Sequence, residues 1–185
     1  NSTLCQTTSA TKGCLLIRCT EAHDMTNPRS IMELRAFIAA VPRTIKIHLW
    51  SGIPCTGGSP VQNLNKRFRN HASRMRQHEE MFNKLFSGLK TIARVLTLRG
   101  DTLSIEWPMG NRYWGRDDVR QLLAELKTNT FEVVGCAFGL RVPTGVDAGK
   151  FLEKHWHIES NMPNLRNHLA RSCPHNHQHT TIDGY

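Results

Sequence analysis

The segment around Cys55 combines residue types that favour nucleophilic chemistry. It reads SGIPCTGGS over residues 51–59 and directly follows an alternating apolar stretch. Pro54 restricts the backbone before the thiol, and the glycines after it permit the close approach of a ligand. A cysteine ahead of a helix faces the positive end of that helix, which lowers the thiol pKa and favours the thiolate. The alternative is a structural turn with an incidental cysteine.

A second reactive group lies near the C-terminus, where residues 173–179 read CPHNHQH. Thiolates and imidazoles are ligands that zinc prefers. Three of these side chains are candidate ligands: Cys173, His177 and His179. A fourth ligand would come from elsewhere, with three candidates: His155, His157 and His168. The alternatives are a metal-free, His-rich tail and, as a narrower case of the metal site, a three-ligand catalytic zinc.

Aromatic and cationic side chains gather just after residue 106. They are Trp107, Arg112, Tyr113, Trp114 and Arg116. Aromatic faces stack on unpaired bases, and neighbouring guanidinium groups contact the nucleic-acid backbone. We favour the alternative that these rings pack against the end of a sheet. A thiol hydrolase pairing of Cys55 with His48 or His71 is also open, although ten histidines make such a pair easy to find by chance.

Positive charge is concentrated in one part of the chain. The 185 residues have a formal net charge of +9 and a pI of about 9.6. Residues 61–100 contain nine Lys and Arg side chains but only two acidic ones, Glu79 and Glu80. A basic cluster favours polyanions such as DNA or RNA through counterion release, although a solvated helix face has the same composition. The candidate nucleic-acid contacts are Lys66, Arg67, Arg69, Arg74 and Arg76.

Hydrophobic periodicity predicts the elements that position these residues. Strands are expected at 13–21, 44–50, 102–107, 131–140 and 154–160, and helices at 31–41, 61–98 (with a break), 116–128 and 162–172. The alternation predicts a single α/β domain over residues 1–185, with a Rossmann-like, mainly parallel sheet and helices on both faces. Residues 1–12 are a candidate disordered segment, and residues 173–185 form the His-rich tail.

Ligands bind at the carboxyl ends of strands in such sheets. Three segments directly follow expected strands, namely residues 51–59, 106–111 and 138–145. We therefore expect these three segments to lie along one rim and to contribute to one site.

The Cys55 loop resembles the catalytic loop of cytosine-C5 DNA methyltransferases, whose pattern is close to G-x-P-C-x-G-x-S. The fixed positions are matched by Gly52, Pro54, Cys55, Gly57 and Ser59. The resemblance implies that Cys55 attacks cytosine C6 and that Glu106, at the end of the next strand, holds the ring nitrogen.

The resemblance covers roughly residues 44 to 145 and extends to a later strand and loop that contain Gly139 and Pro143. It implies a nucleobase-sized pocket lined by Pro54, Gly57, Ser59, Trp107, Arg112 and Trp114. It also implies S-adenosylmethionine as the methyl donor.

The chain departs from the family pattern at several points. No glycine-rich F-x-G-x-G loop precedes Cys55, the family's Q-x-R-x-R segment is missing, and its E-N-V reads Glu106-Trp107-Pro108. Either another chain supplies the S-adenosylmethionine site, or methylation has been lost. Short segments such as CTGGSPVQNLN and VGCAFGL are also similar to uncharacterised parts of retroelement polyproteins, which indicates a parent polyprotein or a partner chain.

The spacing of the cysteines and the hydropathy of the chain indicate where in the cell the protein is located. The six cysteines are irregularly spaced, without a CxxC pair, which favours reduced thiols and an intracellular location. No signal peptide and no apolar run of membrane-spanning length is evident. The chain starts at Asn1 without a methionine, which suggests a piece cut from a longer protein.

Three functions follow from these patterns. The leading one is a nucleic-acid-interacting domain that resembles the catalytic half of a cytosine-C5 DNA methyltransferase. The second is a non-enzymatic, zinc-stabilised module for nucleic-acid binding or polyprotein interaction. The third is a hydrolase that uses Cys55 or a zinc ion in the tail.

Overall fold

The computed structural model describes residues 13–20 and 23–180, and it has an α/β fold built on a four-stranded sheet. The strands are β1 (His48–Ser51), β2 (Thr102–Pro108), β3 (Asn129–Val134) and β5 (His155–Ser160), in the order β1-β2-β5-β3. A small second sheet pairs β4 (Phe151–Leu152) with β6 (His179–Thr180) in parallel. The candidate disordered segment 1–12 lies outside the described residues.

The sheet is mixed, so the expected mainly parallel sheet is wrong. Only β1 and β2 pair in parallel, whereas β5 pairs antiparallel with both β2 and β3. The reason is the return of the chain after β3. The described segment between β3 and β5 contains no α-helix to cross the sheet, and Val134 pairs directly with His155, so β5 starts beside the end of β3 and runs back.

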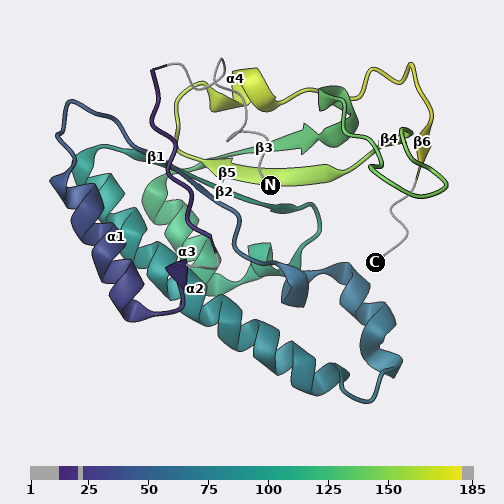
Figure 1. Ribbon diagram of the computed structural model, residues 1–185, viewed down its shortest axis with the longest axis horizontal. Coiled ribbons are helices and arrows are strands. Elements are labelled where there is room, and N and C mark those ends of the chain that lie inside the picture. The colour runs from purple at the N-terminus through teal and green to yellow at the C-terminus, as the bar shows by residue number, and fades with distance from the viewer. Residues whose placement is uncertain (1–12, 21–22, 181–185) are drawn as a thin grey trace.

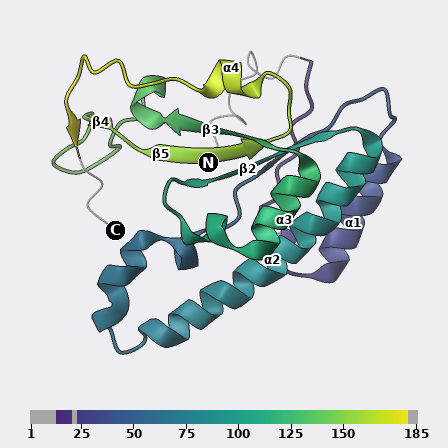
Figure 2. The ribbon, with the colours of Figure 1, turned by 180° about the vertical axis from the view of Figure 1, so that it is seen from behind.

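The helices are α1 (Pro28–Ala40), α2 (His71–Arg99), α3 (Asp117–Leu126) and α4 (Leu165–Leu169). The first three lie on one side of the sheet and the short α4 lies on the other (Figures 1 and 2). Short 3₁₀ helices complete the chain: η3 (Thr56–Gly58), η4 (Pro60–Arg67), η5 (Arg112–Gly115) and η6 (Gly135–Phe138). No helix in the described part is long and apolar enough to cross a membrane.

The core forms where α2 and α3 pack on the sheet. The rings of Phe82 and Phe86 on α2 stack at 5.3 Å, and the ring of Phe82 also meets the indole of Trp107 on β2. Val119 and Leu122 of α3 close the same cluster. Burial of these large apolar side chains supplies the main stabilising term of the fold, and it fixes β2 as the strand from which the Cys55 loop and η5 are positioned.

Two expected strands differ from the structure, whereas the break expected in the helical region 61–98 is present. Residues 13–20 form no strand, and Leu15 is 86% exposed, because no strand pairs with this segment among the described residues. The helical region 61–98 divides into η4 and α2 on either side of residues 68–70. The strand expected at 131–140 ends at Val134, because Gly135 turns the chain tightly against Leu140 and Trp156.

Candidate metal centre and the Cys55 loop

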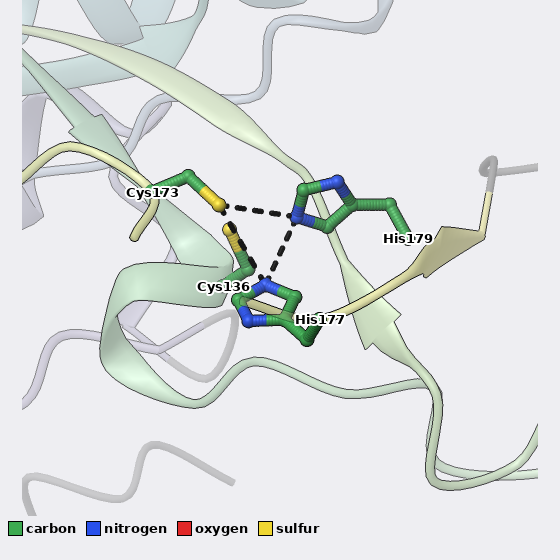
Figure 3. Close-up of side chains that lie close together, drawn as sticks. All are labelled: Cys136, Cys173, His177 and His179. Atoms are coloured by element: carbon green, nitrogen blue, oxygen red, sulfur yellow. Dashed lines mark hydrogen bonds between the residues drawn. The ribbon is translucent and has the colours of Figure 1, made fainter. Parts of the chain in front are cut away.

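Four side chains converge at one end of the molecule to form a cluster that could hold a metal such as zinc (Figure 3). They are Cys136, Cys173, His177 and His179, and we call them the Cys2His2 cluster. Their ligand atoms all lie within 4.8 Å of one another. Cys173 Sγ lies 3.7 Å from Nε2 of His177 and 3.4 Å from Nε2 of His179, and the two Nε2 atoms are 3.0 Å apart.

Local structure explains why these residues meet. The tight turn at Gly135 ends β3 and places Cys136 in η6, with its thiol buried. Cys173 follows α4 and is also buried. His179 lies on β6 opposite Phe151 of β4, and the ring of Phe151 stacks on His177 at 3.8 Å.

The cluster also has polar support around it. Nδ1 of His179 lies 3.2 Å from Glu153 Oε2, and Nδ1 of His177 lies 2.9 Å from Asn176 Oδ1. The backbone N–H of His175 donates to Cys173 Sγ at 3.3 Å. Both imidazoles therefore keep Nε2 for the centre of the cluster.

The three ligand candidates expected in the tail are brought together, but the fourth member was missed. It is Cys136 rather than one of the histidines considered. His155 contacts Glu132 and Glu153, His157 contacts Glu159, and His168 is exposed. Cys136 sits in the apolar run VVGCAFG, which sequence reasoning interpreted as a strand with a buried structural thiol; only the glycine before it indicated a turn.

The Cys55 loop is tied to β2 and η5 by three hydrogen bonds. The indole of Trp107 donates to the carbonyl of Ile53 and the amide of Asn111 donates to the carbonyl of Cys55, both at 2.8 Å. Arg112 donates to the carbonyl of Gly57 at 3.2 Å. The loop is therefore held from the neighbouring strand end, in a fixed backbone conformation.

The residues expected to line a nucleobase pocket do not share one environment: some are buried in the core and others are exposed. Trp107 is 1% exposed and packs in the core, and Gly57 is buried against Tyr113. Ser59 caps η4, while Pro54 and Arg112 are exposed. Trp114 is half-buried between Trp107 and the ring of His157, which it stacks on at 4.3 Å. Packing against the sheet end therefore accounts for most of the aromatic group.

The Cys55 loop leaves β1 beside Glu106 of the neighbouring parallel strand β2. Ser51 pairs with Ile105, and a Cβ on Gly52 would lie 3.4 Å from Glu106 Oε1. Burial raises the pKa of the Cys55 thiol, and the Glu106 charge raises it further. This direction is opposite to the lowering expected from a helix N-terminus, because η3 has only three residues. Burial also raises the pKa of Glu106.

The ring of His48, a candidate partner of Cys55, makes its hydrogen bonds along the sheet. Its Nδ1 lies 2.8 Å from Thr102 Oγ1 and its Nε2 lies 3.1 Å from Ser104 Oγ, so both ring nitrogens are engaged along the sheet. Burial lowers the pKa of His48. His71 begins α2, and its Nε2 is buried without a partner among the described residues.

The basic residues lie on a projection of the molecule. We define residues 60–81, which comprise η4 and the start of α2, as the basic arm. Its α2 part has no buried residue, because burial along that helix begins at Phe82. The arm extends beyond the sheet in both views (Figures 1 and 2). All five candidate contacts on it are exposed: Lys66, Arg67, Arg69, Arg74 and Arg76.

Comparison with known proteins adds no family to this description. No family model matches the chain, and no curated protein or solved structure matches it. Nothing among the described residues supports an S-adenosylmethionine site. The function is therefore inferred from the geometry of the chain itself.

Proposed function

We propose that the chain binds nucleic acid through its basic arm. The supporting observation is the arm's surplus of cations that no described acidic residue neutralises. No carboxylate of the described residues forms an ion pair with Lys66, Arg67, Arg69, Arg74 or Arg76. Of the two acids on the arm, Glu79 pairs with Arg116 outside it. Five free cations on a projecting segment suit a phosphate backbone, which carries closely spaced negative charges.

Apolar side chains on the arm favour nucleic acid over a purely acidic protein surface. Phe68 is 54% exposed between the two helices of the arm, and the guanidinium of Arg67 lies 5.3 Å above its ring. An exposed ring flanked by cations can stack on an unpaired base while the cations contact phosphate. This combination favours single-stranded regions of DNA or RNA.

Salt dependence tests this function. If the five cations neutralise five phosphates, log K should fall with log salt with a slope of about −3.5 on single strands, at roughly −0.7 per phosphate. Fluorescence anisotropy of a labelled oligonucleotide measures the slope. Arg74→Gln should reduce it by about 0.7, one phosphate contact.

The matched control is Arg94→Gln, which removes an exposed cation from the same helix outside the arm. It should leave the slope unchanged. Equal effects of the two substitutions, or affinity that is independent of salt, would contradict binding by the arm. Cys55→Ala should leave binding intact, since the thiol lies outside the arm.

The Cys55 loop starts beside Glu106, and the charge of Glu106 acts on the Cys55 thiol. This arrangement supports a second candidate, namely nucleobase chemistry of the cytosine-C5 methyltransferase type. In this function Cys55 adds to C6 of a cytosine and Glu106 holds and protonates the ring nitrogen. Burial favours the protonated form of Glu106, as that role requires, but it also favours the unreactive thiol of Cys55. Methyl transfer would further require a cofactor site on another chain.

A further inference from the structure

We propose that the Cys2His2 cluster is a closed zinc site with a structural role. Four-coordinate zinc holds sulfur at about 2.3 Å and nitrogen at about 2.0–2.1 Å, which separates neighbouring ligand atoms by roughly 3.3–3.8 Å. The S–N separations of 3.4 and 3.7 Å match this range, and the N–N separation of 3.0 Å is slightly shorter. An ion at the centre requires movement of the rings and of the Cys136 thiol, because the four ligand atoms lie within 4.8 Å of one another but not all at the zinc-bound separation.

The donor set selects the metal. Two thiolates and two imidazoles suit zinc, whereas calcium and magnesium require oxygen ligands. All four positions are filled by the protein, so no open position remains for a water or a substrate. The site therefore differs from the three-ligand catalytic zinc that the tail suggested, and its role is to hold segments of the chain together.

The segments that it holds have little else to bind them. Among the residues that the structure describes, the apolar cluster there consists of Val134, Cys136 and Cys173, with Ala137 and Phe151 packed on its edge. β6 is two residues long and makes one short parallel pairing with β4. Because so little apolar area is buried, a metal that joins η6 to residues 173–179 provides the missing constraint.

Glu153 acts as a positioning residue for this site. Its Oε2 faces Nδ1 of His179 at 3.2 Å, which fixes the tautomer that leaves Nε2 free for zinc. The backbone N–H of His175 stabilises negative charge on Cys173 Sγ in the same way. Neither group would be a ligand, but both orient one.

Metal analysis of the purified chain tests the proposal. After exposure to zinc and removal of loosely bound metal, we expect one zinc per chain. Replacement by cobalt should give the intense visible bands of a tetrahedral site and a thiolate-to-cobalt charge-transfer band. Cys136→Ser should reduce the charge-transfer band, and His179→Ala should lower the metal content. The control is His175→Ala, which removes a neighbouring imidazole outside the cluster and should retain one zinc.

If a substituted chain fails to fold, cobalt titration of the metal-depleted wild-type chain still tests the proposal, because it needs no substitution. Glu153→Gln should weaken zinc binding about 10- to 100-fold while the tetrahedral spectrum persists. The proposal is overturned by a substoichiometric metal content, by an octahedral cobalt spectrum, or by equal metal loss in His175→Ala and His179→Ala. A Cys136–Cys173 disulfide in the freshly reduced, zinc-treated protein would also overturn it. None of these outcomes depends on nucleic-acid binding.

Discussion

The side-chain amide of Asn111 joins the end of β2 to the Cys55 loop by donating to the carbonyl of Cys55 at 2.8 Å. Its own Oδ1 accepts from the backbone N–H of Tyr113 at 3.0 Å, and the residue is 3% exposed. One buried amide therefore fixes both the loop and the start of η5. Displacing an amide that makes two hydrogen bonds is costly, because its former partners are left unpaired in the interior, where water cannot replace the lost hydrogen bonds.

The backbone of Gly58 packs against this amide and should not tolerate a side chain. A Cβ at Gly58 would lie 2.0 Å from Asn111 Oδ1 and 2.9 Å from Cγ of Tyr113. We expect Gly58→Ala to lower the free energy of unfolding by about 1–3 kcal/mol, the usual effect of overpacking. Urea unfolding followed by tryptophan fluorescence measures it.

Gly115→Ala is the matched control for that substitution. A Cβ at Gly115 meets nothing within 4 Å, so its effect should stay within about 0.5 kcal/mol. Equal losses in the two variants would mean that Gly58 is not closely packed against Asn111.

The buried carboxylate of Glu159 should make stability depend on pH. Burial alone would raise its pKa, but hydrogen bonds from His157, Thr128 and Thr130 outweigh burial and lower it. A carboxylate whose pKa is lower in the folded state stabilises the protein above its unfolded pKa of about 4.3. This contribution is lost as the pH falls from there through the folded pKa.

Glu159→Gln should therefore flatten the decline of stability below about pH 5. At neutral pH it should cost about 1–3 kcal/mol, because Thr128 and Thr130 lose a charged acceptor. Urea unfolding over a series of pH values measures both effects, with exposed Glu125→Gln as the control. Parallel pH profiles for wild type and Glu159→Gln would refute the assignment.

The thiol of Cys55 should react slowly with alkylating reagents near neutral pH. It is half-buried, and its pKa is raised by burial and by Glu106. We expect slower iodoacetamide alkylation than at the exposed Cys14, measured by mass spectrometry of the labelled peptides. Glu106→Gln should move the pH profile of Cys55 to lower pH, because it removes a neighbouring negative charge.

Faster reaction at Cys55 than at Cys14 would contradict the raised pKa. An oligonucleotide that protects Cys55 in the wild type would favour the nucleobase-directed function. If it protects neither thiol while the salt-dependent binding persists, nucleic acid contacts the arm alone.

Local sequence patterns predicted several elements well. The periodicity of residues 31–41 indicated a helix where most of α1 lies, although α1 begins earlier, at Pro28. The alternation in TLSIEW indicated β2. These patterns depend on interactions between near neighbours, which the sequence contains in full. The same local reasoning failed at residues 13–20, since a strand also needs a partner strand and none pairs with them among the described residues.

The order of elements predicted the α/β class and the parallel pairing of β1 with β2. It did not predict the direction of β5. That direction depends on how the chain returns after Gly135, where close contact with Leu140 and Trp156 turns it back without a crossover helix.

The ligands of the candidate metal centre also differ in how far the sequence could predict them. The spacing of Cys173, His177 and His179 along seven residues was sufficient to nominate them as ligands from sequence alone. Cys136 could not be nominated, because its thiol belongs to a different segment and only the end of β3, the turn at Gly135 and the pairing of β4 with β6 bring it to the others. The sequence by itself thus determined which reactive side chains are present. The tertiary structure decided which of the distant ones meet at one site, because distances between remote segments are set by packing rather than by local pattern.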